Sequence, residues 1–381
     1  MKYRLEDICS FRKEKVEVSS LTLENYISTE NMLPNKAGIT KATSLPKCNT
    51  TQRFECGDVL VSNIRPYFKK IWKAKFNGGC SNDVLVFSAK KGFDSEFLYY
   101  VLSNDSFFDY SMATSKGTKM PRGDKKSIMN YEVHGFDINI QIKIASILKS
   151  IDDKIELNNK INNNLLEQAL TLYVTQFSSL ELNGCIGDYC SVKSGFAFKS
   201  SWWTNSGIRV IKIGSINQDN LNLLECSYVD KDKADKAKYF VVKAGDLLIA
   251  MTGATIGKFA MVPYASEMLL VNQRVGKFFL GNNPVEKLPF IYCTLKQPEV
   301  YGEVVNRGQG SAQPNISASD IMSIPCVIPS KEAINKFNET VKPLFDLIIS
   351  NQRENQRLSS LRDLLLPRLM SGELDVSDID L

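Results

Sequence analysis

Residues 115–137 read SKGTKMPRGDKKSIMNYEVHGFD, and residues 308–330 read GQGSAQPNISASDIMSIPCVIPS. In both stretches a glycine is followed after three residues by a proline, and after six more by the pair Ile-Met. The two glycines, Gly117 and Gly310, are 310 − 117 = 193 residues apart, and the two prolines keep the same offset. Self-similarity at a fixed offset predicts that one structural unit occurs twice in the chain.

The repeat extends well beyond these two stretches. An offset of 193 also relates Phe97 to Phe290, Ile151 to Leu344, Asp153 to Asp346, Ile155 to Ile348, Asn158 to Asn351, Asn162 to Asn355 and Leu165 to Leu358. Upstream, GDVLV from Gly57 resembles GDLLI from Gly245, and EDICS from Glu6 resembles GDYCS from Gly187, with offsets of 245 − 57 = 188 and 187 − 6 = 181. The shorter offsets predict insertions in the second copy. A period of this size is that of a domain and not of a solenoid module.

The composition is that of a soluble globular protein. The 381 residues are 43% hydrophobic and 23% charged, and the length suits two or three domains. No window approaches the ~20 apolar residues of a membrane span, and the first residues lack the apolar core of a signal peptide. We therefore expect a cytoplasmic protein with no membrane partner. The net charge of +5 permits an anionic partner.

Metal ligands and catalytic groups are scarce in the sequence. The nine cysteines show no CxxC spacing, and His134 is the one histidine. A zinc site needs closely paired cysteines, usually with histidine, and a catalytic triad needs a histidine beside its nucleophile. We therefore expect reduced, mostly structural cysteines and no metal site.

The stretch GATIGKF, from Gly253, resembles a phosphate-binding loop. It has one residue too few between its glycines, and Phe259 stands where a magnesium-binding Ser or Thr belongs. We expect its glycines to form a tight turn near a group that approaches the backbone closely. The sequence shows no Asn/Asp-Pro-Pro-aromatic signature of amino-methyltransferases and no glycine-rich loop of a Rossmann unit. It therefore predicts no catalytic centre and no cofactor bound by this chain.

Each copy is predicted to be a strand-rich globule followed by a long helix. The apolar runs at 58–64, 82–89, 245–253 and 269–281 indicate buried strands, and those at 94–105 and 287–297 indicate short buried helices. Residues 140–177 contain no glycine or proline and carry an apolar stripe at three- and four-residue steps, as one long helix does. The second copy repeats the stripe from Val341 to Leu365, and Pro367 is expected to end or kink that helix.

The matched stripes predict that the two long helices pair with each other, antiparallel. The residues expected in this seam are Ile151, Ile155, Asn158, Asn162, Leu165, Leu344, Ile348, Asn351, Asn355 and Leu358. The asparagines either fix the register of the pair or face solvent, and the sequence leaves both possibilities open. About 20 paired residues span roughly 30 Å, close to the ~34 Å of one turn of B-DNA, which suits a protein that reads split DNA sites.

The predicted fold class is α+β, with two similar strand-rich domains separated by two long helices. The helices would form an antiparallel coiled coil with a pseudo-twofold axis. The expected boundaries are 1–138 for the first domain, 139–180 for the central spacer helix, 181–328 for the second domain, and 329–381 for the distal helix and tail.

Basic and aromatic residues alternate in several segments, as in RPYFKKIWKAKF from Arg65. Lys and Arg bind phosphates, whereas Arg, Asn and Gln read base edges. The candidates for DNA contact are Arg65, Lys69, Lys70, Lys73, Lys119, Arg122, Lys199, Lys258, Asn272, Gln273, Arg274, Arg307, Gln309, Gln313 and Asn315. A single residue of these types is more often an ordinary surface residue. The DNA-binding hypothesis therefore depends on the clusters of candidates and not on any one of them.

A series of motifs resembles the target-recognition domains of specificity subunits of type I restriction–modification systems. In the second copy they are SGFAFKS, GDLLIAMTGATIGK, VNQRVGKF and GSAQPNIS…IMSIPCVIPS. In the first copy, ENMLPNKAGITKATSLP and GDVLVSNIRPYFKKIW…GGCSNDVLVF resemble another recognition-domain subtype of that family. LLLPRLMSGEL resembles the usual end of its distal helix, so the resemblance covers nearly the whole chain.

The resemblance implies a subunit that is not itself catalytic. Such a subunit reads an asymmetric, bipartite sequence in double-stranded DNA, one half per recognition domain, and its paired helices set the spacing and dock two modification subunits. Those partners use S-adenosylmethionine to methylate adenine, and a restriction subunit uses ATP and Mg to translocate and cleave DNA. Base-contacting residues vary with the target in this family, so none carries over by motif.

Two other functions stay open on the sequence alone. One is a fragment of a single-chain restriction–modification enzyme, against which the absent methylation signature argues. The other is a coiled-coil scaffold that binds no DNA.

Overall fold

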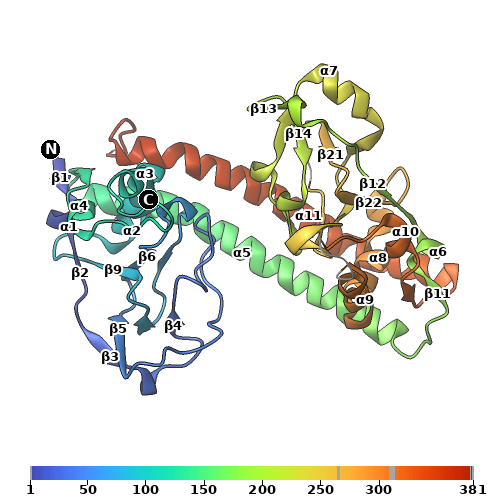
Figure 1. Cartoon of the computed structure of the whole chain (residues 1–381), viewed down its shortest axis with the longest axis horizontal. Helices are drawn as coiled ribbons and strands as arrows, with labels where there is room; N and C mark the ends of the chain where they lie inside the picture. Colours follow the sequence, from blue (N-terminus) through green and yellow to red (C-terminus); the bar gives the residue numbers. More distant parts are fainter. Residues whose placement is uncertain (1, 264–266, 309–313, 378, 380–381) are drawn as a thin grey trace. The chain divides into compact units, whose positions relative to one another are not determined.

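The chain divides into two compact units in a computed structural model, which describes residues 2–263, 267–308, 314–377 and 379 (Figure 1). Unit 1 comprises Met1–Asp153 and Leu358–Leu381, and unit 2 comprises Lys154–Arg357. Each unit therefore contains part of both long helices, α5 (Ile138–Phe177) and α11 (Lys331–Met370).

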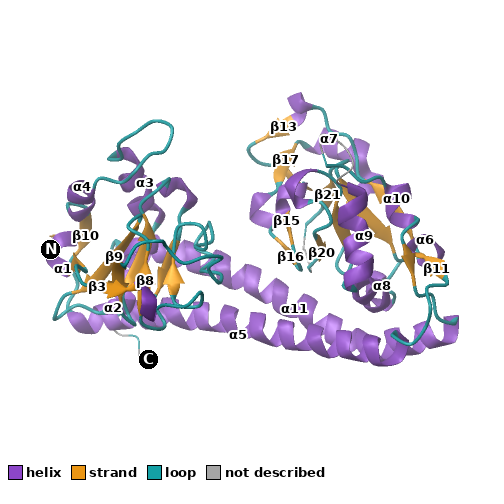
Figure 2. Ribbon diagram, turned by 60° about the horizontal axis from the view of Figure 1, so that its bottom comes forward, coloured by secondary structure: helices purple, strands orange, loops and turns teal. Residues whose placement is uncertain are grey.

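Unit 1 contains two four-stranded sheets and a set of short helices (Figure 2). The first sheet has the order β2-β9-β6-β7, with β2 at Cys9–Phe11, β9 at Val84–Ala89, β6 at Val59–Ser62 and β7 at Ile71–Lys73. The second has the order β3-β5-β8-β4, with β3 at Lys15–Glu17, β5 at Thr50–Phe54, β8 at Gly78–Cys80 and β4 at Tyr26–Ile27. The remaining elements are β1 (Lys2–Arg4), which pairs with β10 (Glu132–His134), and the helices α1 (Leu5–Ile8), α2 (Ser95–Ser103), α3 (Asp105–Ala113) and α4 (Lys125–Met129).

Unit 2 follows the same plan with a larger second sheet. Its first sheet has the order β12-β22-β19-β20, with β12 at Ser191–Ser194, β22 at Val275–Phe279, β19 at Leu247–Ala250 and β20 at Phe259–Met261. The second has the order β13-β17-β14-β21-β18, with β13 at Trp203–Thr204, β17 at Ser227–Val229, β14 at Ile208–Ile211, β21 at Leu269–Val271 and β18 at Val241–Val242. The short strand pairs are β11 (Gly184–Cys185) with β23 (Pro325–Cys326) and β15 (Ile216–Asn217) with β16 (Asn220–Leu221), and the helices are α6 (Ile186–Tyr189), α7 (Lys231–Ala234), α8 (Leu288–Leu295), α9 (Pro298–Gly308) and α10 (Ala318–Met322).

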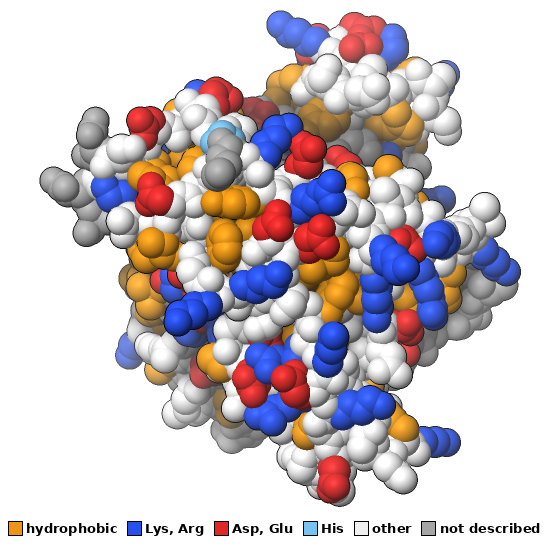
Figure 3. All heavy atoms as spheres, turned by 90° about the vertical axis from the view of Figure 1, so that its left-hand side faces the viewer, with side chains coloured by type: hydrophobic (Ala, Val, Ile, Leu, Met, Phe, Trp, Pro, Cys, Tyr) orange, Lys and Arg blue, Asp and Glu red, His pale blue; other side chains and the backbone are white. Residues whose placement is uncertain are grey.

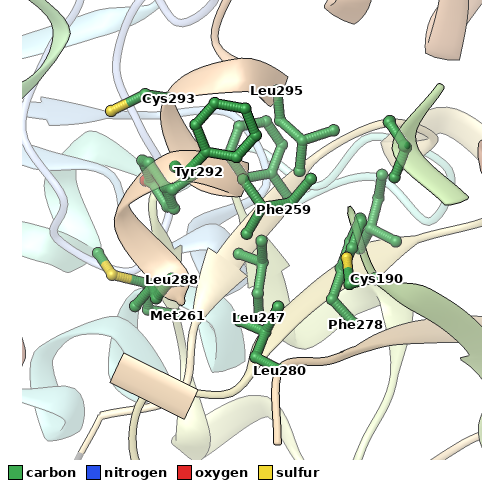
Figure 4. Close-up of a cluster of buried hydrophobic side chains, with 14 of the residues drawn as sticks. Cys190, Leu247, Phe259, Met261, Phe278, Leu280, Leu288, Tyr292, Cys293 and Leu295 are labelled. Carbon is green, nitrogen blue, oxygen red and sulfur yellow. The ribbon is translucent and has the colours of Figure 1, made fainter. Parts of the chain in front are cut away.

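The core of unit 2 forms between its first sheet and α8. Leu247 and Phe259 of the sheet and Tyr292 of α8 are fully buried in one cluster (Figure 4). Successive residues of a strand point to opposite faces, so Leu247 and Ile249 of β19 join this cluster, while Leu248 and Ala250 join a second one. Helix α8 therefore covers one of the two apolar faces of the sheet.

The two units share the topology of the first sheet and of the helices after it, as the repeat predicts. The strand order β12-β22-β19-β20 reproduces β2-β9-β6-β7, and α8 to α10 take the places of α2 to α4. Helices α5 and α11 begin 331 − 138 = 193 residues apart and end 370 − 177 = 193 residues apart. The predicted α+β class, with two strand-rich domains and two long packed helices, is confirmed.

Each first sheet holds a buried aspartate just before its central strand. Asp58 accepts two hydrogen bonds from the Arg12 guanidinium, at 2.5 Å from Nε and 3.1 Å from Nη2. Its counterpart Asp246 pairs with Lys277 Nζ at 2.6 Å. Burial raises the pKa of Asp246 above its usual range, although the Lys277 ammonium opposes this shift. The carboxylate is thus common to both copies, while the neutralising cation comes from a different position in each.

Two details differ from the sequence-based expectation. The apolar run at 269–281 is not one strand, because a turn at 272–274 divides it into β21 and β22, which belong to different sheets. Helix α11 continues to Met370, three residues beyond Pro367, so of the two predicted effects, ending or kinking the helix, the first is wrong.

The long helices pack against each other within each unit. In unit 1, Ile144 and Leu148 of α5 share a core with Leu366 and Leu369 of α11. In unit 2, Ala169 and Tyr173 of α5 share a core with Phe337 and Val341 of α11. Of the expected seam residues, Ile151 and Ile348 are buried, Leu165 and Leu344 pack partly buried against the unit 2 core, and Ile155 and Leu358 are half-buried.

The four asparagines of the seam bond across the helix pair in unit 2. Asn158 Nδ2 donates to Asn355 Oδ1 at 2.9 Å, and Asn351 Nδ2 donates to Asn162 Oδ1 at 2.8 Å. From Asn158 to Asn162 along α5, the bonded residue on α11 moves back from Asn355 to Asn351. The helices therefore run antiparallel. Residue 158 corresponds to 351 in the repeat, and residue 162 corresponds to 355, each at the offset of 193. The two bonds therefore join equivalent residues, with the two helices exchanged. Asn158 is 1% exposed, and a buried amide pair of this kind favours one register over others.

Polar contacts also fasten other elements of each unit to the long helices. In unit 1, Tyr100 of α2 donates to Asp152 of α5 at 2.8 Å, and Arg362 of α11 donates to the same carboxylate at 2.8 Å. In unit 2, the Asp219 carbonyl, at the tip of the β15–β16 hairpin, accepts from Gln352 of α11 at 3.1 Å. Each strand-rich part is therefore held to the helices by directional bonds as well as by apolar packing.

Thiol reactivity should divide the cysteines into two groups. Cys48 and Cys56 are exposed, whereas Cys9, Cys80 and Cys190 are buried, and burial raises the pKa of each of these three to about 12. The thiolate is the reactive form, so at pH 8 the buried thiols are almost wholly protonated and inaccessible. We expect an alkylating reagent to label Cys48 and Cys56 rapidly and the buried three only after denaturation, as measured by peptide mass spectrometry. Rapid labelling of Cys9 or Cys80 in the native protein would contradict this packing.

Candidate nucleic-acid interface

Four loops of unit 2 meet at one end of its first sheet. Strands β12 and β19 both run antiparallel to β22, so the residues after the first two lie beside those before the third. Backbone bonds of 2.9–3.0 Å join the loops: from Gln273 N–H to the Phe196 carbonyl, from Met251 N–H to the Arg274 carbonyl, and from Gly253 N–H to the Pro314 carbonyl. We call residues 195–196, 251–257, 272–274 and 314–315 the unit 2 loop cluster.

The turn in GATIGKF is part of this cluster. Gly253 and Gly257 have φ angles of +74° and +80°, a region that suits glycine. The group that approaches Gly253 closely is the chain's own Pro314 carbonyl. Phe259, which stands in the magnesium-binding position of a phosphate loop, is fully buried. The stretch therefore forms a tight turn that supports the neighbouring loop.

The turn at 272–274 presents two of the predicted base readers. Gln273 and Arg274 are exposed, and no side-chain partner is recorded for either within the described residues. Asn272 is only 6% exposed, and its Oδ1 accepts from the Arg274 N–H at 3.3 Å. Asn272 therefore shapes the turn, while its two neighbours offer donors and acceptors to a partner.

Arg307 has its guanidinium bound within the chain. It pairs with Glu303 at 3.0 Å and donates to Ser323 Oγ at 2.7 Å. The bond to Ser323, which follows α10, and a bond from Nη1 to the Asp320 carbonyl at 3.1 Å join α9 to α10. This arrangement suits a structural role at least as well as a contact with DNA.

The other unit 2 candidates have more freedom or are not described. Asn315 and Lys199 are exposed and Lys258 is half-buried, whereas Gln309 and Gln313 lie outside the described residues. Asn315 forms a β-bridge with Thr252. This bridge is the counterpart of the one between Ile64 and Arg122 in unit 1, at offsets of 188 and 193.

The lysines of RPYFKKIWKAKF are largely engaged within unit 1. Lys69 pairs with Asp105 at 2.8 Å, Lys73 pairs with Glu96 at 2.5 Å, and Lys70 Nζ donates to the Thr29 carbonyl at 2.6 Å. Burial lowers the pKa of Lys70. Sequence alone could not identify these partners, because they come from distant segments.

Arg65 adopts an unusual backbone conformation at the start of this segment. Its φ of +50° lies in the left-handed region, and its buried Nε has no partner among the described residues. Its N–H donates to the Pro121 carbonyl at 2.8 Å, which fixes the loop at 115–126 beside it.

The loop at 115–126 carries the freer candidates of unit 1. Lys119 is exposed, and no partner is recorded for it in the described part of the chain. Arg122 is 57% exposed and pairs with Asp83 at 3.2 Å. An exposed ion pair of this kind is weak and can exchange its carboxylate for a phosphate.

A polar hollow of about 380 Å³ borders these groups in unit 1. Thr29 and Asp83, the partners of Lys70 and Arg122, both line it. On the face shown in Figure 3, basic side chains are interspersed with acidic and apolar ones. The lining of the hollow and the neighbouring Lys70 and Arg122 therefore offer polar groups together with cations, a mixture that nucleic-acid recognition uses.

Metal and membrane sites are not found in the described residues. No three His, Cys, Asp or Glu side chains within them come together as metal binding would require. No helix of the described ranges is both long and apolar enough to cross a membrane.

Comparison with known proteins identifies one family. The family model for the type I restriction modification DNA specificity domain matches residues 1–167 and 182–360. The type I restriction enzyme HindI specificity subunit of Haemophilus influenzae is 23% identical and is matched over 98% of this chain and 99% of that protein. The MjaIX specificity subunit of Methanocaldococcus jannaschii is 28% identical, over 76% of this chain and 71% of that protein.

A solved structure has a similar fold. The S subunit of a type I restriction–modification system from M. genitalium superposes with a TM-score of 0.55 and 18% identity, over 97% of this chain and 96% of that one. At this identity the likeness concerns the fold.

Proposed function

Because the chain belongs to the family of type I restriction–modification DNA specificity subunits, which are not themselves catalytic, we propose that it reads an asymmetric, bipartite DNA target. One half-site is read by residues 1–138 and the other by 181–328. The segments 139–180 and 329–381 act as the spacer between the two recognition domains.

The duplicated topology is the observation that carries this proposal. Both units have the same first sheet and the same helices after it, and these elements support the loops of each unit. The loops differ in sequence between the units, and the second sheets differ in strand order. Similar frames with different loops would place two reading surfaces that recognise different bases. The target is therefore asymmetric.

The partners follow from the family. We infer that the chain binds double-stranded DNA together with two modification subunits, which use S-adenosylmethionine, and with restriction subunits, which use ATP and Mg. The paired helices α5 and α11 dock the modification subunits. The complex works on DNA in the cytoplasm.

An exchange of one recognition domain tests this proposal. Residues 164–349 would be replaced by the equivalent segment of a family member with another target. The new domain then keeps its own parts of the two long helices, and the asparagine pairs of this chain stay unchanged. The exchanged chain is expressed with its modification subunit, and methylome sequencing reads the target. We expect one half-site to change and the other, with the gap, to remain. A change in both half-sites would refute one domain per half-site.

Arg274 and Lys119 should differ in their effect on DNA binding. Arg274→Ala removes an exposed guanidinium from the 272–274 turn and should relax one base position, at a cost of about 1–3 kcal/mol. Lys119→Ala should weaken binding to all sequences alike and lower the salt slope by about one. Fluorescence anisotropy with target and scrambled duplexes at several salt concentrations measures both effects.

Lys70→Ala is the matched control for Lys119→Ala. Lys70 donates to the Thr29 carbonyl, so its loss should leave the salt slope closer to that of the parent. Equal losses of affinity for target and scrambled DNA with Arg274→Ala would show that Arg274 is not a base reader.

A further inference from the structure

Lysine side chains gather around two neighbouring indoles of unit 2. Lys236 Nζ lies 5.3 Å from the centroid of the Trp202 ring, and Lys199 Nζ lies 5.8 Å from it. Lys212 Nζ lies only 3.5 Å from the centroid of the Trp203 ring. Cations at these distances are attracted by the ring faces. We call these five residues the lysine–indole cluster.

The cluster is assembled from separate segments and has a rigid base. Lys199 precedes the 3₁₀ turn Ser200–Trp202, Lys212 follows β14, and Lys236 lies in the 3₁₀ helix Asp235–Phe240 after α7. Both indoles pack on the small core that contains the buried Phe198. Strand β13 and helix α7, which both contribute to this core, are seen together in Figures 1 and 2. The lysines are therefore brought together by tertiary structure and not by adjacency in the sequence.

The charge of the cluster is only partly neutralised by the chain. Asp232, which pairs with Lys233 at 2.5 Å, also interacts electrostatically with Lys236. Lys199 and Lys212 have no acidic partner among the residues that the structure describes. Ammonium groups held around adjacent rings repel one another, and burial lowers the pKa of Lys212. An anion beside them would relieve both costs. An extended anion suits ammonium groups spread over two rings better than a single small ion.

The cluster is connected to the unit 2 loop cluster through one residue. The Phe196 ring stacks on Trp202, with 6.2 Å between centroids and 16° between planes. The Phe196 carbonyl accepts the Gln273 N–H at 2.9 Å. A polyanion bound at the indoles would therefore run next to the exposed Gln273 and Arg274.

We propose that the lysine–indole cluster binds the phosphate backbone of DNA beside the second half-site and so fixes the register of the 272–274 turn on the bases. This inference rests on the proposed function. Phosphate contacts position a protein on the duplex, while base contacts specify the sequence. The cluster supplies the first kind of contact and the turn supplies the second. The competing explanation is that the lysines merely cover two aromatic rings at a solvated surface.

The test replaces Lys199 and Lys236 together by glutamine in the full chain, assembled with its modification subunit. Both side chains are exposed, so the fold should survive, which a melting curve checks. Anisotropy is measured on the target duplex and on a scrambled duplex across a salt series. We expect affinity for both duplexes to fall roughly tenfold or more, the salt slope to decrease by about two, and the preference for the target to remain.

The double variant Lys231→Gln and Lys238→Gln is the matched control. It removes the same charge from exposed positions in the same lysine-rich segment, but neither residue is recorded near an indole. Its salt slope should stay closer to that of the parent. Equal slopes for the two double variants, or an unchanged slope in the Lys199/Lys236 variant, would overturn the proposed anchor. If the parent complex itself shows no preference for the target, the proposed function fails, which is a separate result.

Discussion

A matched insertion of four residues into both long helices should lengthen the gap between the half-sites by about two base pairs. The insertions follow Asn163 in α5 and Ile349 in α11, which are facing positions because residues 158 and 162 bond to 355 and 351. Four residues add about 6 Å and slightly more than one helical turn, so the apolar stripe returns to the same side. At 3.4 Å per base pair, 6 Å corresponds to roughly two base pairs.

The structure shows why both helices must be extended. An insertion in α5 alone would shift Leu165, Ala169 and Tyr173 along α11 and break the core they share with Phe337 and Val341. A matched pair of insertions moves this core together, away from the asparagine pairs, and breaks the bond from Gln352 to the Asp219 carbonyl. Methylome sequencing of the variant and the parent then reads the gap directly.

A matched insertion of two residues is the control. It rotates the following part of each helix by roughly half a turn, which turns the apolar stripe outward and should abolish assembly with the modification subunit. An active four-residue variant with an unchanged gap would show that the helices do not set the spacing. The half-site sequences should be the same in parent and four-residue variant.

Replacement of Arg12 by methionine should destabilise unit 1 by about 3–5 kcal/mol at pH 7. The Asp58 side chain is 4% exposed and would lose both guanidinium bonds, which leaves a buried carboxylate without its bidentate partner.

Urea unfolding at pH 7 measures this loss, and hydrogen exchange of β6 and β9 assigns it to unit 1. Arg53→Met is the matched control, because Arg53 is 44% exposed and its pair with Glu55 at 2.8 Å should contribute less than about 1 kcal/mol. The double variant Arg12→Met with Asp58→Asn removes both charges and should recover most of the stability. A loss for Arg12→Met no larger than for Arg53→Met would mean that the buried pair does not stabilise the sheet.

The sequence predicted best the features that depend on a regular spacing of residues. The offset of 193 predicted two long helices, and α5 and α11 start and end at that offset. Strand-sized apolar runs such as 82–89 became central strands because a buried strand needs only apolar residues and bounding turns. The bonds of Asn158 to Asn355 also resolve a choice that the sequence left open, because an asparagine pattern alone does not reveal which residue faces it across the helix pair.

The candidate interface was less predictable, because a side chain's availability depends on residues far away in the sequence. Lys70 and Arg307 look like other basic residues, yet one is bound by the Thr29 carbonyl and the other by Glu303 and Ser323. The turn at 272–274 is hidden in an apolar run, and only strand pairing shows that it separates two sheets. Of the lysine–indole cluster, only Lys199 was among the candidates, since the members come from segments up to 236 − 199 = 37 residues apart.

The division of the chain also sets an order of folding during synthesis. Unit 1 is completed by Leu366, Leu369 and Val376, which are buried in the same core as Leu5 and Phe97. Between the two parts of unit 1 lie 357 − 153 = 204 residues, all of which belong to unit 2. A ribosome therefore finishes unit 2 before unit 1 can close, the reverse of the usual order in which the amino-terminal domain folds first. Until α11 is synthesised, the apolar stripe of α5 in unit 1 lacks the side chains that cover it in the folded unit.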